Sequence, residues 1–143
     1  PRFARYNLTH LDPYLLAEVD AVAGAFMLMG RAALDQAGLL DEGFYAFGED
    51  IDLCYRIKVH YGWKVYYNPA IVVLHYKGES MKQRSYAMTI EFYKAMWRFH
   101  RKHFAARTFF LLNGLIALGI VSLCGLALVR NALRPAAQKK AGW

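Results

Sequence analysis

The side chains best suited to chemistry form an acidic run directly after an aromatic segment, in residues 43–56 (GFYAFGEDIDLCYR). Glu49, Asp50 and Asp52 occupy the predicted first turn of a helix there. Acids in a first turn offset the positive end of the helix dipole, by about 0.3–1 kcal/mol each, and this structural role is the simplest explanation. One dipole needs fewer acids, however, and neighbouring carboxylates in different environments can act as a base and as a hydroxyl-binding group. Both interpretations of the acidic run are open at this point.

Two predicted elements would position these acids. Residues 48–61 form a helix with apolar side chains at four-residue spacing, which Gly62 closes. Residues 18–29 (EVDAVAGAFMLM) form an apolar run typical of a buried strand, in which Gly24 marks close approach by another backbone or a ligand. The other predicted elements are a helix at 31–37 stopped by Gly38, a loop at 39–47, strands at 63–67 and 70–76 around an Asn68-Pro69 turn, and a helix at 86–104.

The C-terminal part of the chain is strongly apolar. Residues 109–129 contain no charge and would make a helix about 31 Å long, close to the roughly 30 Å hydrocarbon core of a bilayer. A buried helix of a large soluble protein is the alternative. Glycines 114, 119 and 125 could allow close helix packing. Basic residues crowd the approach to this run, which favours a membrane surface over nucleic acid as the partner: Lys94, Arg98, Arg101, Lys102 and Arg107.

Length and composition bound the remaining possibilities. The 143 residues suffice for one modest core, and 57% of them are hydrophobic. The net charge is +7, from 18 Lys and Arg against 11 Asp and Glu. Cys54 and Cys124 form neither a disulfide framework nor a metal spacing, so we expect reduced thiols and a domain that faces the cytosol. The start at Pro1 predicts a piece of a longer protein.

Three ordered motifs give the chain a resemblance to a known family: VDAVAGAFMLMGRAAL, GLLDEGFYAFGEDIDLCYRI and YGWKVYYNPAIVVLHYKGES. Together they resemble the second half of the catalytic domain of family 2 glycosyltransferases, most closely the bacterial rhamnosyltransferase-like branch that builds cell-surface polysaccharides. The resemblance covers about residues 19–104. It implies an α/β fold, the acceptor-side half of a GT-A (Rossmann-like) domain, followed by an amphipathic helix and a hydrophobic membrane helix. The expected boundaries are 1–80 for the catalytic half, 81–107 for the amphipathic helix, 108–130 for the membrane segment and 131–143 for a basic tail.

The resemblance also implies roles for individual residues. Asp50 matches the general base, which removes the proton of the acceptor hydroxyl, and Glu49 would orient the acceptor or the base. His75 matches a histidine near the divalent metal and the diphosphate, where imidazole suits Mn²⁺ better than Mg²⁺. Substrate-binding or site-shaping roles fall on Gly24 and Ala25 in the strand lining the site, Asp41 and Glu42 in the acceptor loop, Tyr45 and Phe47 as sugar-stacking aromatics, and Asp52 and Arg56 in the acidic helix. For Arg56 the expected contact is a salt bridge to Asp52 or Glu49, one turn away.

Two features of the family pattern are missing. The metal-binding Asp-x-Asp and the nucleotide-binding strand would lie before residue 1, so the divalent metal, Mn²⁺ or Mg²⁺, would be bound mostly outside this chain. Asp50 and Asp52 have the same spacing, but they belong to the acidic helix. Processive members carry a Gln-x-x-Arg-Trp motif, and Gln83 is not followed by its Arg-Trp pair.

The implied activity is inverting, non-processive transfer of one sugar from a nucleotide-diphosphate donor, with dTDP-rhamnose as a candidate. The acceptor would be a lipid-linked or cell-surface glycan of polysaccharide or cell-wall biosynthesis. The expected location is the bacterial inner membrane, with the catalytic part facing the cytoplasm, membrane lipids as partners and no nucleic acid. The alternative is a non-catalytic, membrane-anchored binding module that keeps a glycosyltransferase remnant.

Overall fold

The computed structural model describes residues 8, 10–75 and 85–133. The chain divides into two compact units. Unit 1 comprises Pro1–Leu40 and Asp50–His75, and unit 2 comprises Asp41–Glu49 and Tyr76–Trp143.

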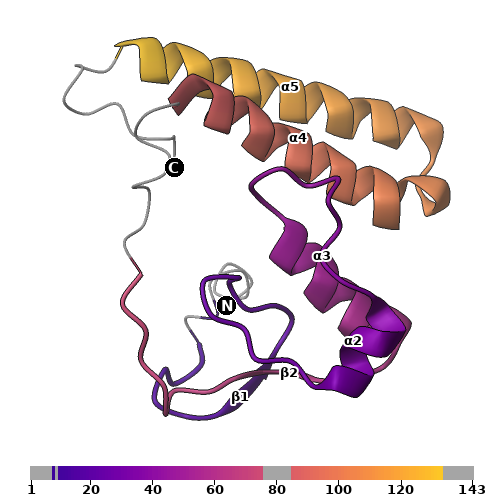
Figure 1. Ribbon diagram of the computed structural model, residues 1–143. Coiled ribbons are helices and arrows are strands. Elements are labelled where there is room, and N and C mark those ends of the chain that lie inside the picture. The colour runs from indigo at the N-terminus through magenta and orange to yellow at the C-terminus, as the bar shows by residue number, and fades with distance from the viewer. Residues whose placement is uncertain (1–7, 9, 76–84, 134–143) are drawn as a thin grey trace. The chain divides into compact units, whose positions relative to one another are not determined.

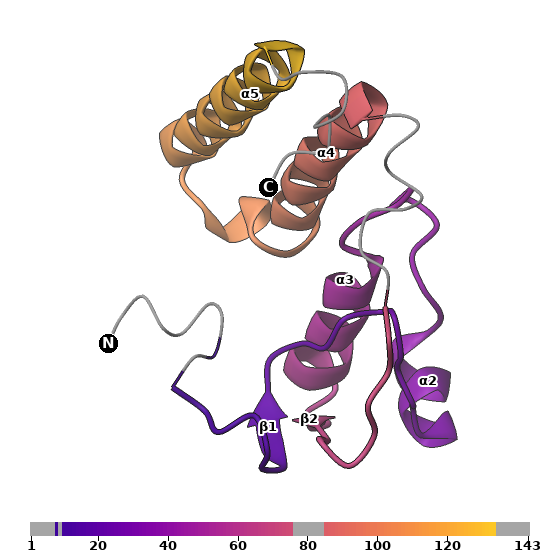
Figure 2. The same ribbon diagram turned by 90° about the vertical axis from the view of Figure 1, so that its left-hand side faces the viewer.

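Unit 1 is a small α/β arrangement (Figure 2). Strand β1 (Ala17–Val19) pairs antiparallel with β2 (Val65–Tyr67), with Val19 opposite Val65. Helix α2 (Arg31–Ala37) precedes α3 (Glu49–Tyr55), whose first residue, Glu49, belongs to unit 2. A π-helical turn (Arg56–His60) continues α3. The buried core of unit 1 joins both strands to α2, α3 and the π-helical turn through Val19, Ala37, Leu53, Cys54, Ile57 and Val65.

Both predicted helices of this unit are confirmed. The helix at 31–37 ends at Gly38, which has a φ of 75° and donates its amide to the Leu34 carbonyl at 2.8 Å. The helix predicted at 48–61 begins at Glu49 and ends before Gly62, which has a φ of 71°. Glycine reaches positive φ without a steric penalty, so the sequence signal for both ends was sound.

The predicted strands are only partly present. The strand expected at residues 18–29 stops at Val19, and residues 20–29 run as a loop with a turn at Gly24-Ala25. The Gly24 amide donates to a side chain, that of Asp50, where a strand would use a neighbouring backbone. The strand predicted at residues 70–76 is not found either. Its described part, residues 70–75, forms no ladder, and Tyr76 lies outside the described residues. The Asn68 turn is confirmed, because its side chain accepts the Ala70 amide at 3.0 Å.

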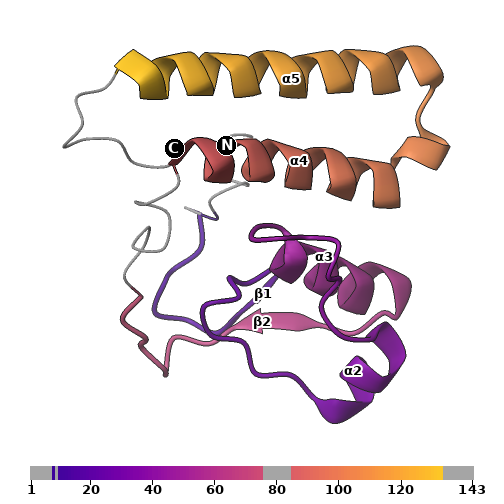
Figure 3. The same cartoon turned by 45° about the horizontal axis from the view of Figure 1, so that its top comes forward.

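The helices of unit 2 form an antiparallel pair. Helix α4 (Ser85–His103) leads through a short 3₁₀ turn (Ala105–Arg107) into α5 (Phe110–Leu133). Figures 1 and 3 both show the two helices side by side. Asn113 of α5 secures the connection: its Oδ1 lies 2.7 Å from His100 Nε2, and its Nδ2 donates at 3.0 Å to the Ala105 and Thr108 carbonyls.

Helix α5 is long and apolar enough to cross a membrane. It has 24 residues, and none of its apolar 18-residue window is buried within the described chain. The three glycines of α5 face open space, which means that close packing through them is not found here. The helix continues through Leu133, into the first residues of the expected tail at 131–143, and residues 134–143 lie outside the described residues.

Candidate active site

Asp50 stands at the start of α3, and its carboxylate is held by backbone amides. Its Oδ2 accepts the Gly24 amide at 2.8 Å, and its Oδ1 accepts the Ile51 amide at 2.8 Å. The side chain is half-buried. A carboxylate has about four lone-pair positions, so two amides leave acceptor capacity for a further hydrogen. Asp50 therefore combines a fixed orientation with the ability to receive a proton.

Gly24 is the residue that allows this contact. A Cβ placed there would lie 3.3 Å from the Asp50 Cβ and 3.5 Å from Oδ2. The close approach expected at Gly24 is present, and the group that approaches is the Asp50 side chain. Ala25 follows in the same turn and is exposed.

Asp52 and Arg56 form a buried ion pair one helical turn apart. The Arg56 Nε donates to Asp52 Oδ2 at 2.8 Å, and the Asp52 side chain has no exposed surface. The same guanidinium donates to the Leu39 carbonyl at 2.7 Å and to the Ala37 carbonyl. The pair therefore ties α3 to the end of α2, a structural role that leaves Asp52 no surface for a substrate. Of the two partners expected for Arg56, Asp52 is the one used.

Glu49 differs from both aspartates. It is the last residue of the unit 2 segment 41–49 and the first of α3. Its Oε2 atom is buried without a hydrogen-bond partner among the described residues. A buried carboxylate oxygen with no donor is costly. The three neighbouring acids thus have three different environments.

The acidic loop of unit 2 is shaped by Asp41. Its Oδ1 accepts the Gly43 amide at 2.8 Å, and its Oδ2 accepts Lys102 Nζ of α4 at 2.6 Å. These bonds, that of Lys102 first, lower the pKa of the Asp41 carboxyl below its usual value. The loop therefore holds its turn through an ion pair with a residue 61 positions away. Glu42, beside it, is exposed.

The aromatic side chains of this loop divide into packed and exposed ones. Phe44 is buried, with the Arg98 and Lys102 cations each 5.9 Å from its ring centroid. Phe47 packs edge-on against Phe92 of α4, with centroids 5.6 Å apart. Tyr45 is 70% exposed, so it is the aromatic with a ring face open to a sugar. The sequence drew attention to Tyr45 and Phe47 but missed Phe44 and its cations, because no local pattern links residues so far apart in the chain.

The described residues give no support to the expected metal contact of His75. His75 is exposed at the end of the unit 1 segment. Within the residues that the structure describes, no three His, Cys, Asp or Glu side chains gather to hold a metal ion. The donor set present does not fit a divalent cation, which prefers several oxygen ligands, and no catalytic step is derived through one.

Comparison with known families decides the relationship. The profile described as "Glycosyltransferase like family 2" matches residues 4–93. The chain belongs to this glycosyltransferase family. The match includes the Gly24 turn, the acidic loop, α3 and the first half of α4, so the α/β elements of unit 1 are those of a family 2 glycosyltransferase domain.

The chain is also similar to individual proteins that are named as rhamnosyltransferases. The chain is 38% identical over 58 residues to "Rhamnosyltransferase WbbL" of Escherichia coli (strain K12), covering 41% of the chain and 22% of that protein. It is 34% identical over 80 residues to "N-acetylglucosaminyl-diphospho-decaprenol L-rhamnosyltransferase" of Mycobacterium tuberculosis, covering 56% of the chain and 25% of that protein. The chain thus matches about a quarter of the length of each relative. No solved structure matches the chain.

Proposed function

We propose that this chain supplies the acceptor side of an inverting sugar transferase, with Asp50 as the general base. The single observation that carries this proposal is the Asp50 carboxylate, which two backbone amides orient and which stays half-buried at the start of α3. A base must be within hydrogen-bond reach of the proton it removes and must be presented in a fixed direction. Asp52 fails the first condition because it is buried in its ion pair with Arg56.

The proposed reaction is a single displacement. The acceptor hydroxyl gives its proton to Asp50 while its oxygen forms a bond to the anomeric carbon of the donor sugar. The bond from that carbon to the nucleoside diphosphate breaks, and the diphosphate leaves with the bonding electron pair. Attack from the opposite face inverts the configuration. In this proposal Glu49 orients the acceptor or the base, and Tyr45, whose ring is exposed, stacks on a sugar ring.

The relatives suggest the substrates. Because two of them are named rhamnosyltransferases, we propose a nucleotide-linked rhamnose, such as dTDP-rhamnose, as donor. The name of the mycobacterial relative gives N-acetylglucosaminyl-diphospho-decaprenol as its acceptor, so we propose a lipid-linked acceptor. The exposed apolar surface of α5 is suited to a membrane. We propose the bacterial inner membrane as the location, with the catalytic part in the cytoplasm. A divalent metal, Mn²⁺ or Mg²⁺, would be bound mostly by residues outside this chain.

The test is Asp50→Asn in the full-length protein. The substitution keeps the size of the side chain and removes the base, so kcat should fall by about 10²–10⁴-fold while donor affinity stays nearly unchanged. Transfer rates and donor binding should be measured separately, with Asp35→Asn as the matched control, since Asp35 is an exposed helical aspartate paired only with Arg31 among the described residues.

Three outcomes would revise the proposal. A variant within about threefold of wild-type kcat would move the base elsewhere, with Glu49 next in line. Loss of donor binding would instead assign Asp50 to the donor or metal site. Acceptor binding without any transfer by the wild-type protein would favour the non-catalytic binding module.

A further inference from the structure

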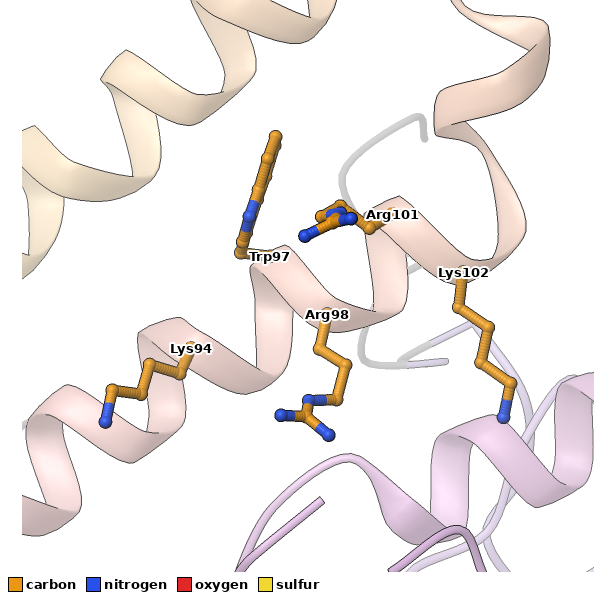
Figure 4. A pocket seen from close by; sticks show the side chains of 5 residues that line it. All are labelled: Lys94, Trp97, Arg98, Arg101 and Lys102. Carbon is orange, nitrogen blue, oxygen red and sulfur yellow. The ribbon is translucent and has the colours of Figure 1, made fainter. Parts of the chain in front are cut away.

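A hollow of about 410 Å³ lies along one helix of unit 2, outside the acidic site. Among the described residues, those that line it all come from α4, and Figure 4 shows the five side chains extending from that helix. The spacing of i, i+3, i+4, i+7 and i+8 brings them to one side of the helix. We name this hollow the α4 cleft; its residues are Lys94, Trp97, Arg98, Arg101 and Lys102.

The four cations of the α4 cleft differ in their existing ion-pair partners. Lys102 donates to Asp41 at 2.6 Å, and Lys94 donates to Glu91 at 2.7 Å. Among the residues that the structure describes, neither Arg98 nor Arg101 has a carboxylate partner. The cleft therefore carries two guanidinium groups outside the ion pairs of the described residues, and the charge of Arg98 also helps to lower the pKa of the Asp41 carboxyl.

Arg98 is also held in place. Its guanidinium lies 5.9 Å from the centroid of the buried Phe44 ring. It lies against the backbone of Gly43 so closely that a Cβ at Gly43 would collide with it. A cation over an aromatic ring and against backbone loses less freedom when it binds a ligand, so Arg98 is preorganised.

The chemistry of the cleft fits a phosphate ester. Guanidinium groups present parallel N–H donors that match the oxygens of a phosphate, and a pair of them matches a diphosphate. The volume is in the range of small-ligand sites, roughly 300–1,000 Å³. Trp97 adds an amphipathic ring of the kind found at membrane–water interfaces. Since α4 connects through three residues of 3₁₀ turn to the apolar α5, the nearest phosphate esters are those of lipids.

We propose that Arg98 and Arg101, with Lys94, bind the diphosphate of the lipid-linked acceptor. The proposal rests on the sugar transfer to such an acceptor proposed above. In it, the α4 cleft holds the charged linkage between lipid and sugar, so that the acceptor is recognised by its diphosphate as well as by its glycan. The same chemistry could come from bulk phospholipid headgroups, and the experiment must separate the two sources.

The experiment measures lipid binding to the full-length protein in detergent micelles by native mass spectrometry. Three probes are titrated: a polyprenyl diphosphate, the matching polyprenol without phosphate, and phosphatidylglycerol. The wild-type protein should prefer the diphosphate to both others. Arg98→Gln with Arg101→Gln should weaken diphosphate binding at least about tenfold, because each lost charge-assisted contact is strong. Arg107→Gln with Arg130→Gln removes the same charge outside the cleft and should change binding less than about twofold.

Every other result overturns the proposal. Equal binding of the polyprenol would mean that the lipid chain alone is recognised. Equal binding of phosphatidylglycerol would mean that the cleft binds lipid headgroups in general. An equal loss of diphosphate binding in the Arg107 and Arg130 control variant would mean that only net charge matters. Arg101→Gln alone, at an exposed position, tests the cleft without disturbing the Phe44 contact, and unchanged diphosphate binding by it and by the double variant would exclude the site.

Failure of this proposal is distinguishable from failure of the catalytic one. Asp50→Asn protein should bind the polyprenyl diphosphate as the wild type does. If Asp50→Asn abolishes transfer while both arginine variants bind the diphosphate as the wild type does, the base assignment stands and the cleft proposal fails. Normal transfer by Asp50→Asn, together with weakened binding in the arginine variants, would do the reverse.

Discussion

At the scale of single residues, two salt bridges with the same helical spacing differ in how exposed their side chains are. Arg31 and Asp35 pair at 2.8 Å with side chains 87% and 58% exposed. Arg56 and Asp52 pair at the same distance, with exposures of 12% and 0%. Removing one partner of a buried pair leaves an uncompensated charge, whereas exposed pairs contribute little because water screens them. The contrast makes each pair a control for the other.

Arg56→Met should therefore destabilise the protein by about 3–5 kcal/mol, whereas Arg31→Met should cost about 0.5 kcal/mol or less. The larger loss includes the two backbone carbonyls, of Ala37 and Leu39, that Arg56 also satisfies. The free energy of unfolding should be measured for both variants by urea titration of the full-length protein in mild detergent. Losses of equal size would show that the Asp52 pair is solvated in the intact protein.

The different roles of the acidic residues mark the limit of what the sequence could predict. The spacing of Glu49, Asp50 and Asp52 identified the segment and the start of the helix. It could not assign the buried member, because burial of Asp52 depends on the end of α2 packing against α3. Nor could it show that Gly24, distant in sequence, would donate its amide to Asp50.

At the scale of elements, the pairing of α4 and α5 bears on how α5 meets a bilayer. If α5 crosses the membrane, an α4 that stayed beside it would carry its cations into hydrocarbon, at about 2.5–3.5 kcal/mol each near the centre. A helix lying flat at the interface needs a polar face, and α5 is apolar on nearly all sides. A spanning α5 therefore implies that the two helices part at the turn Ala105–Arg107 on membrane insertion.

Helix α5 should hold the protein in the membrane fraction through high-salt and carbonate washes. Attraction by the α4 cations is screened within about 3 Å at 1 M salt, while burial of apolar surface is not screened. Truncation after Arg107 separates the two contributions. The shortened protein should bind anionic vesicles at low salt and leave them at high salt, as co-sedimentation would show. Release of the intact protein by salt alone would identify α5 as a soluble core helix.

The sequence predicted helices better than strands, for a reason that particular residues show. Gly38 and Gly62 end helices through positive φ, a local property. The run at residues 18–29 has strand-like composition, yet only its first two residues, Glu18 and Val19, pair within β1, because strand pairing depends on distant backbone. The apolar character of α5 was equally local, and its length was predicted closely.

For the whole molecule, the 143-residue chain alone should not release nucleoside diphosphate from any nucleotide sugar. It matches about a quarter of each relative, and the residues that the structure describes gather no metal ligands. A panel of nucleotide sugars with Mn²⁺ or Mg²⁺ tests this through diphosphate release over time. Steady release above the rate without protein would show that the chain holds a donor site of its own.

The short ladder of unit 1 has a consequence for how the molecule behaves in solution. In the part of the chain that the structure describes, β1 and β2 have only each other as partners, so both outer edges present unpaired backbone groups. Such edges are templates for association between molecules. Here charge surrounds them: Glu18 contacts Lys58 and Lys64 at 3.3 Å, and Lys58 also donates to the Val19 carbonyl at 3.0 Å. Three-residue strands flanked by lysine and glutamate are poor templates for a shared sheet, so we expect these charges to limit association of the protein through its strand edges at high concentration.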